Sequence, residues 1–250
     1  MIKRALMAAA IAGGASHAYS QDDTEPTWAM AIELGAISTS GNTETLSVQS
    51  KADIRQDLEK WQNEYMASVL FKQDEVEQDG VTNTATTAEK YFLSAKTAYK
   101  LNREHSNLFL FGSHTDDKFG AFRKYTTISA GYGTRWINRD NLYWDVEIGP
   151  GYFRGTRFLE DDSEISETGF MVRGATELQW ELTETTTFAQ TLSVESASDN
   201  TRTISDTSLS LKISDTLQMK IGYSLFHNTE VAPDKEAVDT TTFINLVYSR

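Results

Sequence analysis

Residues 217–225 read Leu-Gln-Met-Lys-Ile-Gly-Tyr-Ser-Leu, and this stretch decides the fold class. Every second residue is apolar, whereas Lys220 and Gly222 lie between apolar neighbours. Successive side chains of a β-strand point to opposite faces, so a period of two is typical of a strand. The stretch therefore predicts a strand with one apolar face. That face consists of Leu217, Met219, Ile221, Tyr223 and Leu225.

The same alternation recurs along nearly the whole chain, and helical spacing of apolar residues is almost absent. In residues 46–55, Val48 and Ile54 share one face and Lys51 shares the other with further charged residues. Such segments predict an all-β chain of about twelve antiparallel strands. Residues 108–111 are apolar on both faces and residues 188–195 alternate weakly, so their faces stay unassigned. Without these two segments the count would be ten.

The connections between the predicted strands alternate in length. An even number of strands with short turns at one end and long loops at the other is typical of outer-membrane barrels. This arrangement places both termini on the short-turn side, which is the periplasmic side. The short connections are residues 57–60, 102–106, 138–141, 183–185 and 214–216. The other set comprises residues 39–44, its shortest member, and 72–90, 116–124, 154–167, 196–205 and 228–239.

A soluble β-sandwich with a solvated polar face is the main alternative to a membrane barrel. Segments of roughly ten residues match a tilted strand crossing the hydrocarbon layer, whereas soluble strands are usually shorter. Large aromatic residues cluster near the predicted strand ends, where a membrane interface favours them. We therefore expect an antiparallel transmembrane β-barrel, closed because an open edge is costly in lipid. The aromatic residues are Trp28, Trp61, Tyr99, Trp136, Trp144, Trp180 and Tyr248.

The N-terminus has the pattern of an export signal. Lys3 and Arg4 precede an uncharged, largely apolar run over residues 5–16, and Ala18-Tyr19-Ser20 resembles a cleavage site. We predict a signal peptide over residues 1–20, a short periplasmic segment over residues 21–27 and the barrel over residues 28–250. The expected location is the outer membrane of a Gram-negative bacterium. The formal net charge of −13 argues against a nucleic-acid partner.

The polar faces of the strands carry charges of both signs. If these faces point inward, the lumen is lined by nearly balanced charges that can pair across the interior. A lumen filled by such pairs is structural and narrow, whereas water between the charges makes a small pore with weak ion selectivity. Both arrangements fit a barrel of this size. The predicted lumen-facing charged residues are Lys51, Asp53, Arg55, Arg135, Asp145, Glu147, Arg173, Glu177 and Glu181.

Catalytic and metal-binding motifs are not apparent. His114 precedes Asp116 and Asp117, a pattern that can orient an imidazole in a hydrolase. His227 lies on a predicted strand far around the barrel, so we favour a solvated residue at the rim over a shared catalytic site. Acidic runs in the loops lack the spacing of a calcium loop. We therefore expect no enzyme activity, no catalytic residue, no metal and no cofactor.

Three segments together resemble a known family. They are the first strand and hairpin from Trp28 to Thr45, the motif Glu147-Ile148-Gly149-Pro150-Gly151-Tyr152, and residues 245–249 near the C-terminus. They are similar to the salt-induced outer-membrane protein family (YdiY-like), a domain of unknown function. The resemblance implies an outer-membrane barrel without assigned activity and a link to salt or osmotic conditions. Unlike the family's usual aromatic terminus, this chain ends in Arg250, but Ile244, Leu246 and Tyr248 keep the alternation, so we expect insertion to occur with lower efficiency.

These observations predict a narrow passive channel for ions or small solutes. A structural or surface-interaction barrel with a plugged lumen is the alternative, and an outer-membrane hydrolase is the least favoured hypothesis. The expected partners are outer-membrane lipid, the barrel-assembly machinery during insertion, and ions or small solutes.

Overall fold

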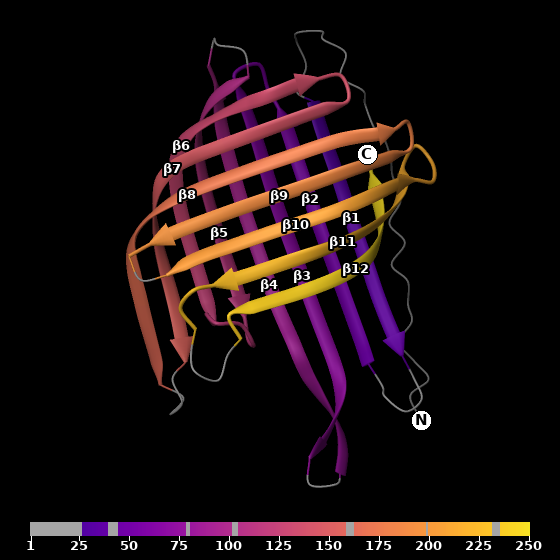
Figure 1. Cartoon of the computed structure of the whole chain (residues 1–250), viewed down its shortest axis with the longest axis vertical. Helices are drawn as coiled ribbons and strands as arrows, with labels where there is room; N and C mark the ends of the chain where they lie inside the picture. The colour runs from indigo at the N-terminus through magenta and orange to yellow at the C-terminus, as the bar shows by residue number, and fades with distance from the viewer. Residues whose placement is uncertain are drawn as a thin grey trace.

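The computed structural model describes residues 27–39, 45–78, 81–101, 105–158, 163–198, 200–231 and 236–250. They form a closed barrel of twelve antiparallel strands, in which each strand pairs with its sequence neighbours and β1 pairs with β12 (Figure 1). The predicted fold class and strand count are confirmed. The strands are β1 (Thr27–Thr39), β2 (Thr45–Asp57), β3 (Trp61–Gln78), β4 (Val81–Lys100), β5 (Ser106–Asp117), β6 (Lys124–Arg139), β7 (Leu142–Phe158), β8 (Glu164–Thr183), β9 (Thr186–Ala197), β10 (Thr201–Lys212), β11 (Leu217–Asn228) and β12 (Val238–Ser249).

The two ends of the barrel differ. The start of β1, the end of β12 and the short connections lie at one end, which we call the turn end and which is uppermost in Figure 1. The opposite end, the loop end, carries the connections after the odd-numbered strands. No helix of sufficient length and apolarity to span a membrane occurs among the described residues. The predicted signal peptide and periplasmic segment lie outside the described residues, apart from Thr27.

The alternating sequence produces an apolar outer surface. On β11, Met219, Ile221 and Tyr223 are exposed on the outside, because their faces meet no other layer of the protein. Aromatic pairs lie near both ends of this surface. The edge-to-face pair of Trp136 and Trp144 has ring centroids 5.3 Å apart at the turn end. These rings form the kind of girdle that marks a membrane interface.

Strand β5 shows which of its two apolar faces points outward. Leu108 and Leu110 are exposed on the outside, whereas Phe109 is almost fully buried inside the barrel. Phe109 lies opposite Ala98 on β4 and Gly131 on β6, and these small residues leave room for its ring. Strand β9, weakly patterned in sequence, pairs along its length with both β8 and β10.

Several predicted loops are in fact strands. Most of residues 72–90 belongs to β3 and β4, whose hairpin protrudes beyond the barrel in Figure 1. Residues 154–158 continue β7, residues 164–167 begin β8, and β10 begins at Thr201. Polar residues signalled loops in sequence, but outside the lipid a strand needs only backbone pairing and tolerates polar side chains. The threonine-rich start of β4 also suits extended backbone.

The glycine motif on β7 brings two backbones close together. Because proline cannot donate to the ladder, a bulge or local kink is expected at Pro150. The register of β7 with β8 runs unshifted through it, and the β6–β7 register is the same on both sides of Gly149 and Pro150, to which no β6 partner is assigned. The shift in β6–β7 pairing lies instead at Arg135/Ile137. A Cβ atom at Gly149 would collide with the backbone of Ala130, and one at Gly131 with the backbone of Ile148. Close strand approach, rather than a bulge, is therefore what the motif provides.

Candidate functional site in the barrel interior

An ion pair joins opposite walls of the barrel. Arg55 on β2 donates to both carboxylate oxygens of Glu177 on β8, at 2.9 and 3.1 Å. These strands lie six positions apart in the ring of twelve, so the pair spans the lumen. The Tyr143 hydroxyl on β7 donates to the same carboxylate at 2.9 Å. The interior is therefore bridged at this level.

Further ion pairs surround this bridge. Arg135 binds Asp145 through two parallel hydrogen bonds of 2.7 and 2.8 Å, the geometry in which arginine binds carboxylates best. Lys51 lies 3.1 Å from Asp53 on the same strand. The side chains in these pairs retain 29 to 45 % of their accessible surface, so they remain in contact with water. We call this set the charged layer: Lys51, Asp53, Arg55, Arg135, Asp145 and Glu177.

A drier set of charges lies next to this layer. Lys96 is 2.7 Å from Glu147 and 3.2 Å from Glu64, and so connects β4 to β7 and β3. Arg173 lies 3.4 Å from Glu147, and its guanidinium covers the ring of Phe111 at 4.0 Å. The Arg173 side chain is only 8 % exposed. The side chains of Lys96, Glu147 and Arg173 are thus less exposed than those of the charged layer.

At the loop end an arginine is enclosed by aromatic rings. Arg202 on β10 is 3 % exposed and donates through Nη2 to the hydroxyl of Thr115 on β5 at 3.0 Å. Its guanidinium lies over the rings of Tyr125 at 4.2 Å and Phe226 at 4.8 Å. The side chain therefore reaches across the interior from β10 to β5 and β6. Cation–π contacts of this kind gain strength where water is excluded.

The connection between β5 and β6 folds into this end of the lumen. Its Phe122 is buried edge-on against Tyr125, and Tyr125 stacks on Phe153 at 5.6 Å. A cavity of about 10 Å³ beside these rings has room for roughly one water molecule. We call this set the plug: Thr115, Phe122, Tyr125, Phe153, Arg202 and Phe226.

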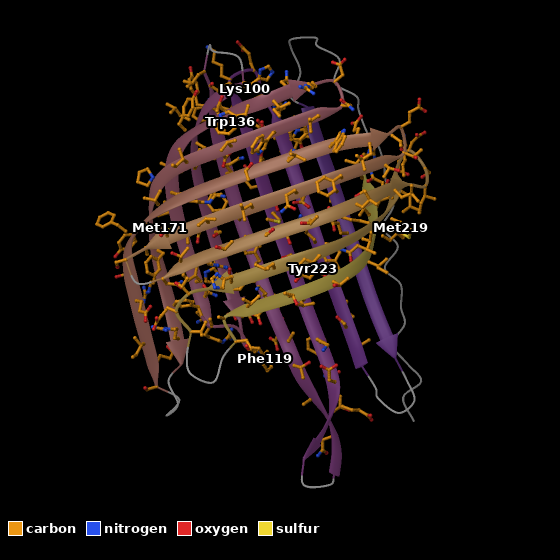
Figure 2. All side chains as sticks on the ribbon, in the orientation of Figure 1. Lys100, Phe119, Trp136, Met171, Met219 and Tyr223 are labelled. Carbon is orange, nitrogen blue, oxygen red and sulfur yellow. The ribbon has the colours of Figure 1, made fainter. Side chains whose placement is uncertain are left out.

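Backbone hydrogen bonds hold residues 118–123 in place. The Lys118 N–H donates to the Glu89 carbonyl on β4 at 3.0 Å, and the Arg123 N–H donates to the Thr156 carbonyl on β7 at 2.8 Å. Figure 2 labels Phe119 in this connection, far from Lys100 and Trp136 at the turn end. The plug is thus anchored to both neighbouring hairpins.

The structure brings most of the charged residues singled out from sequence into these contacts. Glu181 differs, because it is exposed beside the β8–β9 turn and joins none of the ion pairs described above. Glu33, Glu195 and Arg202 are among the charged interior residues that the sequence reasoning missed. Glu33 lies on the face of β1 opposite its apolar residues, so the alternation could have placed it inside the barrel. Lys220 lies 2.7 Å from its carboxylate. Glu195 and Arg202 were hidden by weak alternation and by an expected loop.

The histidine considered for hydrolysis lies on the outer face. His114 Nδ1 is 2.8 Å from the Thr126 hydroxyl. Asp116 forms an ion pair with Arg123 instead, and Asp117 lies 3.1 Å from Lys90. The arrangement therefore lacks a carboxylate that orients the imidazole. In the part of the chain that the structure describes, no group of three or more acidic or histidine side chains is placed to hold a metal ion.

Solved structures with similar folds are outer-membrane barrels. The NanC porin aligns with a TM-score of 0.53 at 10% identity, covering 88% of this chain and 99% of that porin. The translocator domain of the autotransporter NalP from Neisseria meningitidis aligns with a TM-score of 0.49 at 12% identity, covering 91% of this chain and 89% of that domain. The similarity to the porin concerns the fold alone.

Sequence comparison identifies the family. "Uncharacterized protein YdiY" of Escherichia coli (strain K12) is 26% identical over 219 residues, which are 87% of this chain and 81% of that protein. The model of the family described as "Protein of unknown function, DUF481" matches residues 32–249, nearly the whole barrel. The chain therefore belongs to this family.

Proposed function

We propose that the protein is a narrow passive channel for ions or small solutes, in which the plug limits conduction. The observation that carries the proposal is the difference in water contact along the lumen. The charged layer keeps up to 45 % side-chain exposure, whereas Arg202 in the plug is 3 % exposed. A low-conductance pore can be built from charges in contact with water at one end and a dry constriction at the other.

The energetics of buried charges also support a channel. Well-packed apolar side chains hold protein interiors together at least as well as ion pairs, because charges lose hydration on burial. Dry ion pairs that filled the lumen would make it structural, whereas pairs that keep water contact, as Arg55 and Glu177 do, leave a polar route through the interior.

A planar-bilayer measurement tests this function. We expect small, infrequent conductance steps for the natural protein. The double variant Phe122→Ala/Arg202→Ala removes the ring and the guanidinium that close the lumen, and should conduct in larger or more frequent steps. Phe119→Ala is the matched control, because Phe119 lies in the same connection but is exposed. If natural protein and double variant are both silent over a range of salt and voltage, the channel function is wrong.

A structural or surface-interaction barrel is the second candidate. The bridge from Arg55 to Glu177 favours it, because it ties opposite walls together, and so does the protruding β3–β4 hairpin. This function predicts no conductance. It also predicts that shortening the hairpin weakens the envelope while leaving the barrel folded. Detergent sensitivity of cells and the heat-modifiable gel shift of the purified protein measure these two effects separately.

The proposed setting is the outer membrane of a Gram-negative bacterium, with the turn end in the periplasm. Export by residues 1–20, insertion by the barrel-assembly machinery, surrounding outer-membrane lipid and a response to salt belong to the same proposal, which includes neither an enzymatic role nor a nucleic-acid partner. N-terminal sequencing of the mature protein should begin at Gln21, and the protein should fractionate with outer membranes. Expression that is unchanged by osmotic upshift would contradict the salt link.

A further inference from the structure

A row of polar residues crosses the outer face of the barrel at the loop end. His114 on β5 lies opposite Thr126 on β6, and Thr126 lies opposite Arg154 on β7. All three are exposed, and the His114 ring is fixed by its 2.8 Å contact with the Thr126 hydroxyl. Toward the turn end the outer face of these strands presents apolar residues such as Ile128, so the row lies at the border of an apolar surface.

Lys124 adds a second cation to this row. It lies two residues before Thr126 on β6, diagonally adjacent to Arg154, and both cations are exposed. Neither makes an ion pair with any described residue. Asp116 faces Lys124 in register, but its carboxylate is engaged by Arg123. Lys124 and Arg154 thus keep their charge available to a ligand outside the barrel.

Neighbouring aromatic residues indicate the depth of the row in the membrane. Tyr152, two residues before Arg154 on the same face, meets Phe170 edge-to-face with ring centroids 5.6 Å apart. Phe170 is 85 % exposed, as expected of a ring that contacts lipid rather than protein. Aromatic girdles lie at the border between hydrocarbon and headgroups. Arg154 and Lys124 therefore lie just beyond that border, at headgroup depth.

We propose that His114, Thr126, Lys124 and Arg154, here called the outer basic patch, bind the phosphate of a glycolipid headgroup in the outer leaflet. Arginine and lysine form charge-assisted hydrogen bonds with phosphate oxygens, and the hydrogen-bonded pair of His114 and Thr126 adds one donor beside them, either the Nε2–H or the hydroxyl. The chain as a whole has a net charge of −13 and repels anionic lipid, so a local excess of cations is needed to hold one. This inference goes beyond the channel function and rests only on the proposed orientation in the outer membrane.

Native mass spectrometry of the full-length protein, folded in a neutral detergent, measures the binding. The probe is bisphosphorylated lipid A, and dephosphorylated lipid A is the lipid control. We expect the double variant Lys124→Gln/Arg154→Gln to bind the phosphorylated lipid roughly 25-fold more weakly than the natural protein does. The matched variant Lys60→Gln/Arg139→Gln removes two exposed cations at the turn end and should bind within about twofold of the natural protein.

Three results would overturn the proposal. Equal affinity of the natural protein and Lys124→Gln/Arg154→Gln for phosphorylated lipid A would exclude the patch. Equal affinity of the natural protein for the dephosphorylated lipid would show that apolar contact alone binds it. Displacement of the lipid by millimolar inorganic phosphate would identify the free ion as the ligand. The heat-modifiable gel shift checks folding of each variant, and a silent bilayer in the conductance experiment leaves this inference unaffected.

Discussion

The charged layer and the plug lie in one lumen but use charge in different ways. In the charged layer, arginines face carboxylates and keep contact with water, as Arg55 does with Glu177. In the plug, Arg202 contacts the Thr115 hydroxyl and two aromatic rings, lies opposite the buried Glu195 in the β9–β10 pairing, and is almost completely buried. The difference shows that an inward-facing position alone does not determine whether a charged side chain in a barrel is hydrated. The surrounding side chains decide whether it meets water or a dry contact.

The cost of each arrangement follows from its water content. Partly hydrated pairs gain little from their attraction, because water screens them and the side chains lose freedom. An arginine buried among rings loses its hydration, so it must recover that loss through hydrogen bonds, cation–π contacts and packing of its aliphatic stem. The plug should therefore respond more strongly to substitution than the charged layer.

The largest effect is expected for Phe153→Ala in the plug. Phe153 is buried and stacks on Tyr125, so its truncation leaves a cavity where neighbouring strands cannot collapse. We expect the free energy of unfolding to fall by about 3 kcal/mol. Urea unfolding of the protein in detergent, followed by tryptophan fluorescence, measures it. A loss below about 1 kcal/mol would mean that the plug is loosely packed.

The second-largest loss of stability is expected for Gly149→Ala on β7. The added methyl group would meet the backbone of Ala130 on β6, and a backbone cannot rotate away as a flexible side chain can. We expect a destabilisation of about 2 kcal/mol. Gly174→Ala on β8 is the matched control, because a Cβ atom there meets nothing within 4 Å. Equal unfolding midpoints of both variants would contradict the close approach.

A smaller, salt-dependent effect is expected for Glu177→Gln in the charged layer. The substitution keeps the shape of the side chain but removes the charge that Arg55 faces. Because the pair is partly hydrated, we expect a loss of about 1 kcal/mol at low salt and less at high salt. The double-mutant cycle with Arg55→Gln, measured at two salt concentrations, isolates the pair. A coupling that does not change with salt would place the pair in a dry environment like that of the plug.

The smallest effect is expected for Glu181→Gln, also on β8 but exposed beside the β8–β9 turn. We expect its free energy of unfolding to match that of the natural protein within about 0.5 kcal/mol. The same measurement as for Glu177→Gln applies. A larger loss would reveal a role at the rim that the ion pairs of the lumen do not explain.

The fold could be predicted from sequence because parity is a local property. Alternation along a single strand predicts the face on which each side chain lies, as it does for Leu46, Lys51 and Ile54. Repetition of this pattern along the chain predicts a barrel. Phe109 and Phe111 could not be placed in this way, because both parities of β5 are apolar. The small residues Ala98 and Gly131 on the neighbouring strands leave room inside the barrel for Phe109, and strand register is needed to find them.

The candidate site was harder to predict for a related reason. Arg135 and Asp145 lie on adjacent strands, so their contact follows from a hairpin. The contacts of Arg55 with Glu177 and of Arg202 with Thr115 join strands that are distant both in sequence and around the ring. No local pattern contains that information. Likewise, nothing local in residues 118–123 indicates that Phe122 folds inward while Phe119 stays exposed.

The anchoring of residues 118–123 determines the timescale on which the plug can open. The backbone bonds of Lys118 to Glu89 and of Arg123 to Thr156 close both ends of this connection. Moving Phe122 out of the lumen requires breaking backbone bonds together with stacked contacts, which is a local unfolding event rather than a side-chain rotation. Such openings belong to the microsecond-to-second range instead of nanoseconds. Conducting periods would then be rare and separated by long silent intervals, and the amide protons of Lys118 and Arg123 would exchange with solvent only during those openings.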